Sequence, residues 1–155
     1  MKKAIGKWML VVAAFLVAQG AVASSWKQDF GMALAEAKDS GKYILMNFSG
    51  SDWCGWCIKL DKEVFSREVF NTYADQNLVL VSVDFPRGTP QSNKQIWHNE
   101  LLKRQFEVEG FPSILLLSPA GDLVARTGYQ PGGAEAYIAH LQGFIEKHKN
   151  SKLQK

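Results

Sequence analysis

The sequence is poor in side chains that hold metals, with three histidines and two cysteines among 155 residues. A structural zinc ion needs about four ligands, and His98, His140 and His148 form no spaced pair with one another or with the cysteines. A covalent haem is also disfavoured, because Ile58 stands where the Cys-x-x-Cys-His attachment motif requires histidine. We therefore expect no metal and no cofactor, and we expect the three histidines at the surface.

The chain also lacks a surplus of charge once its N-terminus is set aside. It carries 18 basic and 15 acidic residues. Three of the basic residues are Lys2, Lys3 and Lys7, and without them 15 basic residues remain against 15 acidic ones. A nearly neutral domain gives no reason to expect a nucleic-acid partner.

No apolar run reaches the roughly 20 residues that a membrane-spanning helix needs. An uninterrupted apolar stretch at residues 8–18 follows the three lysines and precedes Ala21, Val22 and Ala23. This order is typical of a secretory signal peptide. We predict that residues 1–23 direct export and are removed after Ala23; the alternative is an uncleaved N-terminal anchor.

The remaining residues, 24–155, have the composition of one globular domain, since the chain is 46% hydrophobic and 21% charged. A capping box of Ser25 and Gln28 predicts a first helix that ends near Gly41. Ser66 is expected to cap a short helix, and the last helix is expected to run from Ala134 to about His148, before a frayed tail. Other predicted helices cover residues 55–64 and 92–106.

Four strands are predicted at residues 43–48, 78–83, 113–117 and 123–127, and the last two form an antiparallel hairpin. The order of elements is helix, strand, helix, strand, helix, hairpin, helix. This order predicts an α/β fold with a central mixed β-sheet flanked by helices on both faces. The polar segment between Phe85 and Trp97 is expected to be a solvated loop.

The two cysteines stand three residues apart, in Trp53-Cys54-Gly55-Trp56-Cys57. A disulfide across so short a ring removes little entropy from the unfolded chain, which disfavours a purely structural bridge. At the start of a helix, unpaired N–H groups and the helix dipole favour the thiolate of Cys54, which predicts a nucleophile. Cys57, one turn further on, is placed to resolve a mixed disulfide.

This pentapeptide and the later Gly110-Phe111-Pro112-Ser113 resemble the two active-site segments of thioredoxins, in the same order. The resemblance covers residues 26–148. The longer run from Gly50 to Cys57, followed by residues 64–66, is similar to that of exported thioredoxin-like disulfide reductases of bacteria. It implies the thioredoxin fold.

The resemblance further implies that Pro112 is cis, lies opposite the cysteines and leaves the backbone of Phe111 free to pair with an extended substrate. Trp53, Gly55 and Trp56 join these two residues as expected substrate contacts, although packing in the core is an alternative for Trp53. Lys59 and Lys62 follow at helical spacing, where a solvated helix face is the expectation.

Two departures from thioredoxin affect rates and redox poise. Trp56 stands where thioredoxin has proline, and Asn47 stands where it has a buried aspartate. Asn47 cannot titrate, so the proton acceptor that would assist Cys57 is absent or replaced.

The resulting hypothesis is a monomeric periplasmic protein that reduces disulfides in exported proteins and receives electrons from a membrane protein. Direction depends on reduction potential, so a disulfide oxidase or isomerase that uses the same cysteines is an alternative. A non-redox binding module, or holdase, that grips peptides with Trp53, Trp56 and Phe111 is another.

Overall fold

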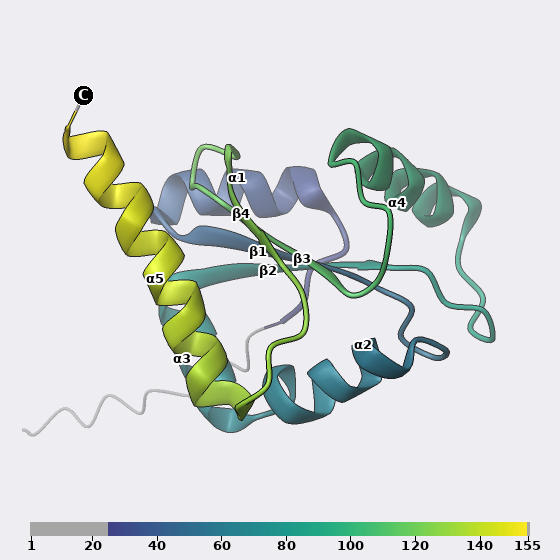
Figure 1. Ribbon diagram of the computed structural model, residues 1–155. Helices are drawn as coiled ribbons and strands as arrows, with labels where there is room; N and C mark the ends of the chain where they lie inside the picture. Colours follow the sequence, from purple (N-terminus) through teal and green to yellow (C-terminus); the bar gives the residue numbers. More distant parts are fainter. Residues whose placement is uncertain (1–24, 155) are drawn as a thin grey trace, which may run out of the picture.

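The computed structural model describes residues 25–154 and shows one sheet enclosed by helices (Figure 1). The predicted signal peptide and its cleavage after Ala23 lie outside the described residues. In the described part, none of the helices combines the length and the apolar character that crossing a bilayer requires.

The sheet has four strands in the order β2-β1-β3-β4. Their bounds are β1 Tyr43–Ser49, β2 Leu78–Asp84, β3 Ser113–Leu117 and β4 Leu123–Thr127. β1 pairs parallel with β2 and antiparallel with β3, and β3 and β4 form the predicted antiparallel hairpin. The sheet is therefore mixed, as predicted.

Helices cover both faces of the sheet (Figure 1), which confirms the predicted α/β architecture. One face carries α1 (Phe30–Ser40) and α4 (Asn93–Gln105). The other carries α2 (Gly55–Leu60), the π-helical turn η1 (Asp61–Phe65), α3 (Glu68–Asn77) and α5 (Gly133–Leu153).

Alternation along the buried strands produces two cores. Successive strand side chains point to opposite faces, so Leu45 packs with the α2, α3 and α5 layer whereas Ile44 and Met46 pack with the α1 and α4 layer. The first core is rich in aromatic rings. Phe65 of η1 lies among three others: Trp26, Phe70 and Tyr137.

The first helix begins later than the sequence suggested. Asp29, not Ser25, is its N-cap and accepts the N–H of Met32 at 2.9 Å. The residues before it are extended, because Lys27 pairs with β2 through Leu80 and Ser82 at 2.9 and 2.8 Å. Tertiary pairing therefore overrides the local capping pattern.

Two further helix ends were predicted wrongly. Ser66 does not cap α3: its hydroxyl donates to Asp61 at 2.8 Å, and Arg67 takes the N-cap position without a side-chain hydrogen bond. η1 continues the helical path from α2, so no new start signal is needed at Ser66. α5 continues beyond His148 to Leu153.

Replacement of Phe65 by alanine tests the aromatic core. Because Phe65 is 3% exposed and contacts three rings, we expect Phe65→Ala to lower the free energy of unfolding by about 3–5 kcal/mol. Chemical denaturation of the oxidised protein measures this. The control Met32→Ala, at a side chain 68% exposed, should change it by less than about 0.5 kcal/mol. Equal effects would contradict this description of the core.

Candidate active site

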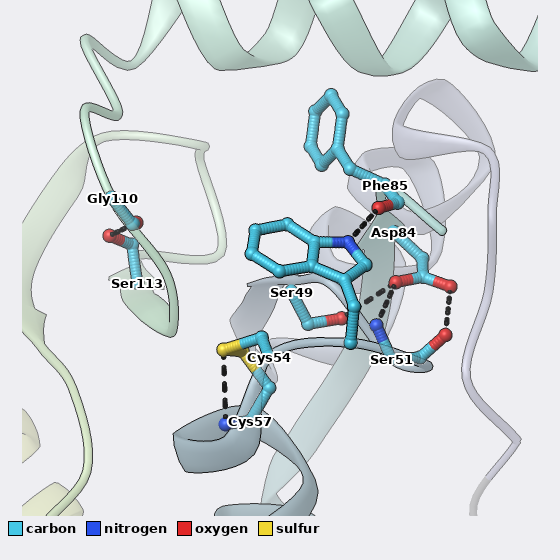
Figure 2. The surroundings of a disulfide bond; sticks show 9 residues. Ser49, Ser51, Cys54, Cys57, Asp84, Phe85, Gly110 and Ser113 are labelled. Atoms are coloured by element: carbon cyan, nitrogen blue, oxygen red, sulfur yellow. Dashed lines mark hydrogen bonds between the residues drawn. A yellow bond between two sulfur atoms is a disulfide. The ribbon is translucent and has the colours of Figure 1, made fainter. Parts of the chain in front are cut away.

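Cys54 and Cys57 form a disulfide at the start of α2, which follows β1 through a short turn (Figure 2). Their Cα atoms are 5.2 Å apart. Cys54 is the N-cap residue, 8% exposed, and Cys57 lies in the first turn, 5% exposed. The structure thus brings the two predicted thiols together, with the less exposed one further into the helix.

The helix start supplies a hydrogen bond to sulfur. The backbone N–H of Cys57 donates to Sγ of Cys54 at 3.2 Å. In the reduced protein the same N–H and the positive end of the helix would stabilise a thiolate at Cys54. Geometry therefore favours Cys54 over Cys57 as the ionised thiol.

The turn before Cys54 is held by the carbonyl of Gly50, which accepts the N–H groups of Trp53 and Cys54 at 3.2 and 2.8 Å. A Cβ atom at Gly50 would overlap the indole ring of Trp53. Glycine is therefore required here, because the ring lies directly against the backbone. Gly55, in contrast, is exposed, and a Cβ there would meet open space.

Two carboxylates fix this turn to the end of β2. Asp84 accepts the hydroxyl of Ser49 at 3.1 Å and both the N–H and the hydroxyl of Ser51, at 2.9 and 2.6 Å (Figure 2). Asp52 accepts the backbone N–H groups of residues 87, 88 and 89 at 2.6–3.2 Å. The turn is thereby tied to β2 and to the loop that follows it.

The bonds to Asp52 also change its acidity. The backbone N–H groups of Arg87 and Gly88 stabilise the ionised carboxylate, so the pKa of Asp52 lies below its ordinary value. The segment after Phe85 was expected to be a solvated loop. It is exposed at residues 87–90, but its backbone is bound to the turn that carries the cysteines.

Trp53 belongs to a group of aromatic rings beside Cys54. It is 37% exposed, its Nε1 donates to the carbonyl of Phe85 at 2.8 Å, and its ring meets that of Phe111 edge-on at 6.0 Å. Phe85 and Phe111 stack at 5.1 Å. The guanidinium of Arg87 lies 3.8 Å from the centre of the Trp53 ring.

Trp56 is 58% exposed and lies in a different group. Its ring contacts Tyr129 at 5.1 Å, and Nζ of Lys59 lies 5.2 and 5.0 Å from these two rings. Glu63 accepts the Tyr129 hydroxyl at 2.6 Å and lies 3.9 Å from Lys59. Lys59 and Lys62 are both exposed, as predicted for a solvated helix face. Lys59 in addition contacts two aromatic rings and Glu63.

The Phe111–Pro112 peptide bond is cis. In Figure 2 the segment that carries Gly110 and Ser113 lies across from Cys54, and the Ser113 hydroxyl donates to the carbonyl of Gly110 at 2.6 Å. Within the described residues, the backbone N–H and carbonyl of Phe111 make no backbone hydrogen bond. Both groups are therefore free to pair with another chain.

A pocket of about 370 Å³, lined by both polar and apolar side chains, lies beside Cys57. Asn47 lines it, and its buried Oδ1 has no hydrogen-bond partner in the described part of the chain. Asp61 and Asp84 line the same pocket. Two titratable carboxylates thus stand near Cys57 although Asn47 itself cannot titrate.

The histidines are less exposed than predicted. His148 pairs with the hydroxyl of Tyr43 and His140 with that of Thr127, each at 2.9 Å, and all three histidines are half-buried. Packing of α5 against the sheet explains the change for these two. Within residues 25–154, no three His, Cys, Asp or Glu side chains gather as metal ligands would.

Sequence reasoning missed several residues that shape the site: Asp52, Asp84, Phe85, Arg87 and Tyr129. Asp52 stands close to Cys54 in the sequence, but aspartate is common in loops and its role is not evident from that. The other four residues come from segments distant from the cysteines in the sequence. The available signal was Asp84 at the end of the predicted strand, where polar side chains of neighbouring parallel strands meet.

A Cys-x-x-Cys disulfide at a helix start, on a mixed sheet covered on both faces, defines a thioredoxin-fold redox protein. A family model described as a thioredoxin-like domain matches residues 30–143. The disulfide bond reductase DsbH of Chlamydia pneumoniae is 35% identical over 119 residues, which make up 77% of this chain and 72% of that protein.

Two further similarities agree. The thioredoxin-related protein DsbJ of Chlamydia pneumoniae is 33% identical over 103 residues, or 66% of this chain, but the match spans 30% of its own length. The solved structure of a DsbH oxidoreductase superposes with a TM-score of 0.76 at 31% identity, covering 94% of this chain and 95% of that one. The chain therefore belongs to the thioredoxin-like domain family, and its activity class is thiol–disulfide oxidoreduction.

Neutralising Asp52 tests its role in holding the site. We expect Asp52→Asn to lower the melting temperature of the oxidised protein at about pH 7, because the amide group accepts the three N–H groups less strongly than a carboxylate does. The pKa of Asp52 is lower in the folded protein than in the unfolded chain. This stabilisation is therefore fully present above about pH 4, and it disappears as the pH falls through the pKa of the folded state.

The difference between wild type and Asp52→Asn should therefore shrink towards about pH 2. Asp39→Asn is the matched control, because Asp39 is an exposed residue of α1 whose side chain makes no hydrogen bond or ion pair within residues 25–154. A pH-independent difference would contradict the assignment of the stabilisation to the carboxylate.

Proposed function

We propose that this protein is a periplasmic reductase of protein disulfides, with Cys54 as the attacking thiol and Cys57 as the resolving thiol. One observation carries the proposal: the cysteine pair at the start of α2 lies across from the segment that carries Phe111, whose backbone N–H and carbonyl make no backbone hydrogen bond within the described residues. An extended substrate can add its backbone there by β-strand pairing while presenting its disulfide to Cys54.

The reaction runs in two exchanges. The Cys54 thiolate attacks one sulfur of the substrate disulfide, forms a mixed disulfide and releases the other substrate sulfur as a thiolate, which takes up a proton. The Cys57 thiolate then attacks Sγ of Cys54 and releases the second substrate thiol. Two electrons pass to the substrate, and the protein is left with the Cys54–Cys57 disulfide that the structure contains.

Burial and hydrogen bonding suit these separate roles. Cys54 receives the N–H of Cys57, which stabilises a thiolate, whereas Cys57 is the less exposed of the pair. Cys54 is flanked along the chain by three of the proposed substrate contacts: Trp53, Gly55 and Trp56. The other two, Phe111 and Pro112, form the segment proposed to bind the substrate backbone. The name of the similar DsbH protein, a disulfide bond reductase, supports reduction as the direction.

The predicted signal peptide at residues 1–23 supports the proposed location. A reductase in an oxidising compartment must be reduced again, so we propose a membrane protein as electron donor and disulfide-containing exported proteins as substrates. The protein would act as a monomer. The same residues would serve an oxidase or isomerase if the dithiol were the more stable form.

Replacement of Cys57 by serine tests the order of attack. Without the resolving thiol, we expect Cys57→Ser to accumulate mixed disulfides through Cys54 when incubated with a folded protein that contains a disulfide, because the second exchange cannot occur. Non-reducing electrophoresis and intact mass measure the adduct.

Cys54→Ser is the matched control and should trap at least about tenfold less, since the remaining thiol is the more buried one. More adduct with Cys54→Ser than with Cys57→Ser would reverse the two roles. Two results together would favour the non-redox binding module. Neither single variant would trap a partner, and the double variant Cys54→Ser, Cys57→Ser would still restore the phenotype that is lost when the protein is deleted.

A further inference from the structure

Cys57 must lose a proton before it can resolve a mixed disulfide, because the thiolate and not the thiol attacks sulfur. The residue is 5% exposed, and burial in general disfavours the charged form of an ionisable group. Bulk water therefore reaches this thiol poorly. An acceptor that lies close to Cys57 would make the second exchange faster.

The pocket beside Cys57 contains two carboxylates, those of Asp61 and Asp84. The other side chains that line it do not titrate near neutral pH: Trp26, Asn47, Ser49, Ser51, Ile58 and Ser82. The volume of about 370 Å³ is many times the roughly 30 Å³ that one water molecule occupies in the liquid. Water in this pocket can therefore connect the thiol to a carboxylate.

Asp84 already has another role. Its Oδ1 accepts the hydroxyl of Ser49 at 3.1 Å and the N–H of Ser51 at 2.9 Å, and its Oδ2 accepts the Ser51 hydroxyl at 2.6 Å (Figure 2). Both oxygens are thus occupied by donors from the turn that leads to the cysteines. Asp84 holds that turn, which leaves Asp61 as the better candidate for the acceptor.

Asp61 lies one helical turn after Cys57. Its backbone N–H donates to the carbonyl of Cys57, so the two side chains lie on the same face of the helical path. Its Oδ2 accepts the Ser66 hydroxyl at 2.8 Å, and its Oδ1 accepts no hydrogen bond within the described residues. Asp61 is also exposed. A proton accepted there can therefore pass on to bulk water.

The charges around Asp61 leave its carboxylate unpaired. The two ion pairs within residues 25–154 do not include it, since Lys59 pairs with Glu63 and the other pair lies elsewhere. Lys62, the next residue, lines a different pocket. Asn47 adds a fixed polar group to the pocket beside Cys57, because its buried Oδ1 has no partner in the described part of the chain and can accept a hydrogen bond from water there.

We propose that Asp61 accepts the proton of Cys57 through water in this pocket and thereby accelerates the second exchange. The proposal rests on the proposed function, because it deepens the resolving role of Cys57. The thiol gives its proton to Asp61, and the Cys57 thiolate attacks Sγ of Cys54. The substrate sulfur leaves with the electron pair of the broken bond and takes up a proton from solvent, and Asp61 returns its own proton to bulk water.

The second exchange can be measured separately with dithiobis(nitrobenzoate), a symmetric aromatic disulfide. Attack by the Cys54 thiolate of the reduced protein releases one coloured thiolate, at a rate that rises with reagent concentration. Attack by Cys57 on the resulting mixed disulfide releases the second, at a rate that does not. The reagent is used at concentrations that make the first phase the faster one. Because the released aromatic thiolate is a good leaving group and needs no proton, the pH dependence of the second phase reports on Cys57.

We expect Asp61→Asn to leave the first phase nearly unchanged and to slow the second by at least about tenfold at about pH 6.5. The difference should shrink towards about pH 9.5, because an ordinary thiol, with a pKa of about 8.5, ionises there without an acceptor. Asp61→Glu should retain most of the wild-type rate, since it keeps a carboxylate at the same position.

Two control variants separate proton transfer from structure. Ser66→Ala removes the hydrogen bond donated to Asp61 but keeps the carboxylate. Glu68→Gln removes an exposed carboxylate of α3 that does not line the pocket. Both variants should show the wild-type rate of the second phase at every pH.

A purely electrostatic role of Asp61 predicts the opposite sign, since loss of a neighbouring negative charge favours a thiolate. An unchanged or faster second phase in Asp61→Asn, a deficit that is equal at all pH values, or a similar deficit in Ser66→Ala would overturn the proposal. Failure of the proposed function has a different signature. In that case the wild-type protein would show both phases with the small reagent but would not reduce the disulfides of other proteins.

Discussion

Parallel pairing of β1 with β2 positions the whole site, because the two strands end together. Their register places Ser49 opposite Asp84, so the side chain that ends β2 can bind the turn that leaves β1. The Asp84 carboxylate then fixes Ser49 and Ser51, and Asn99 of α4 donates to the Asp84 backbone carbonyl at 2.8 Å. Cys54 follows this fixed turn directly and begins α2.

The same arrangement explains why two separate aromatic groups flank the disulfide. Asp52 draws the loop after β2 towards the cysteine turn, and this brings Phe85 and Arg87 to Trp53. On the other side, the loop after β4 brings Tyr129 to Trp56 and Lys59. Glu63 pairs with Lys59 in the second group, and the Asp52 carboxylate, which binds the backbone N–H of Arg87, lies beside the first.

Sequence periodicity predicted the fold well because its strands are strongly apolar and short turns separate them. All four strands and the hairpin were found within a residue or two of their predicted bounds. The errors lie where tertiary contacts compete with local signals. Lys27 pairs with β2 instead of continuing a helix, and η1 carries the chain past Ser66 without a new cap.

For the site, the motif around Cys54 and the segment around Pro112 could be predicted, since each is continuous in sequence. The contacts of Asp52 could not, because its partners are backbone N–H groups 35 or more residues away. Nor does any local pattern place Arg87 over Trp53 or Tyr129 beside Trp56. These contacts depend on the loops that the sheet brings together.

If the Cys54–Cys57 pair donates electrons to substrates, its equilibrium reduction potential must be that of a reductant. The measurement is a titration of residues 24–155 against a defined thiol buffer, followed by alkylation and intact mass. A reductase should give a value near about −270 mV, as thioredoxin does. A value near about −120 mV, typical of a strong oxidant, would contradict the account and assign the same residues to an oxidase.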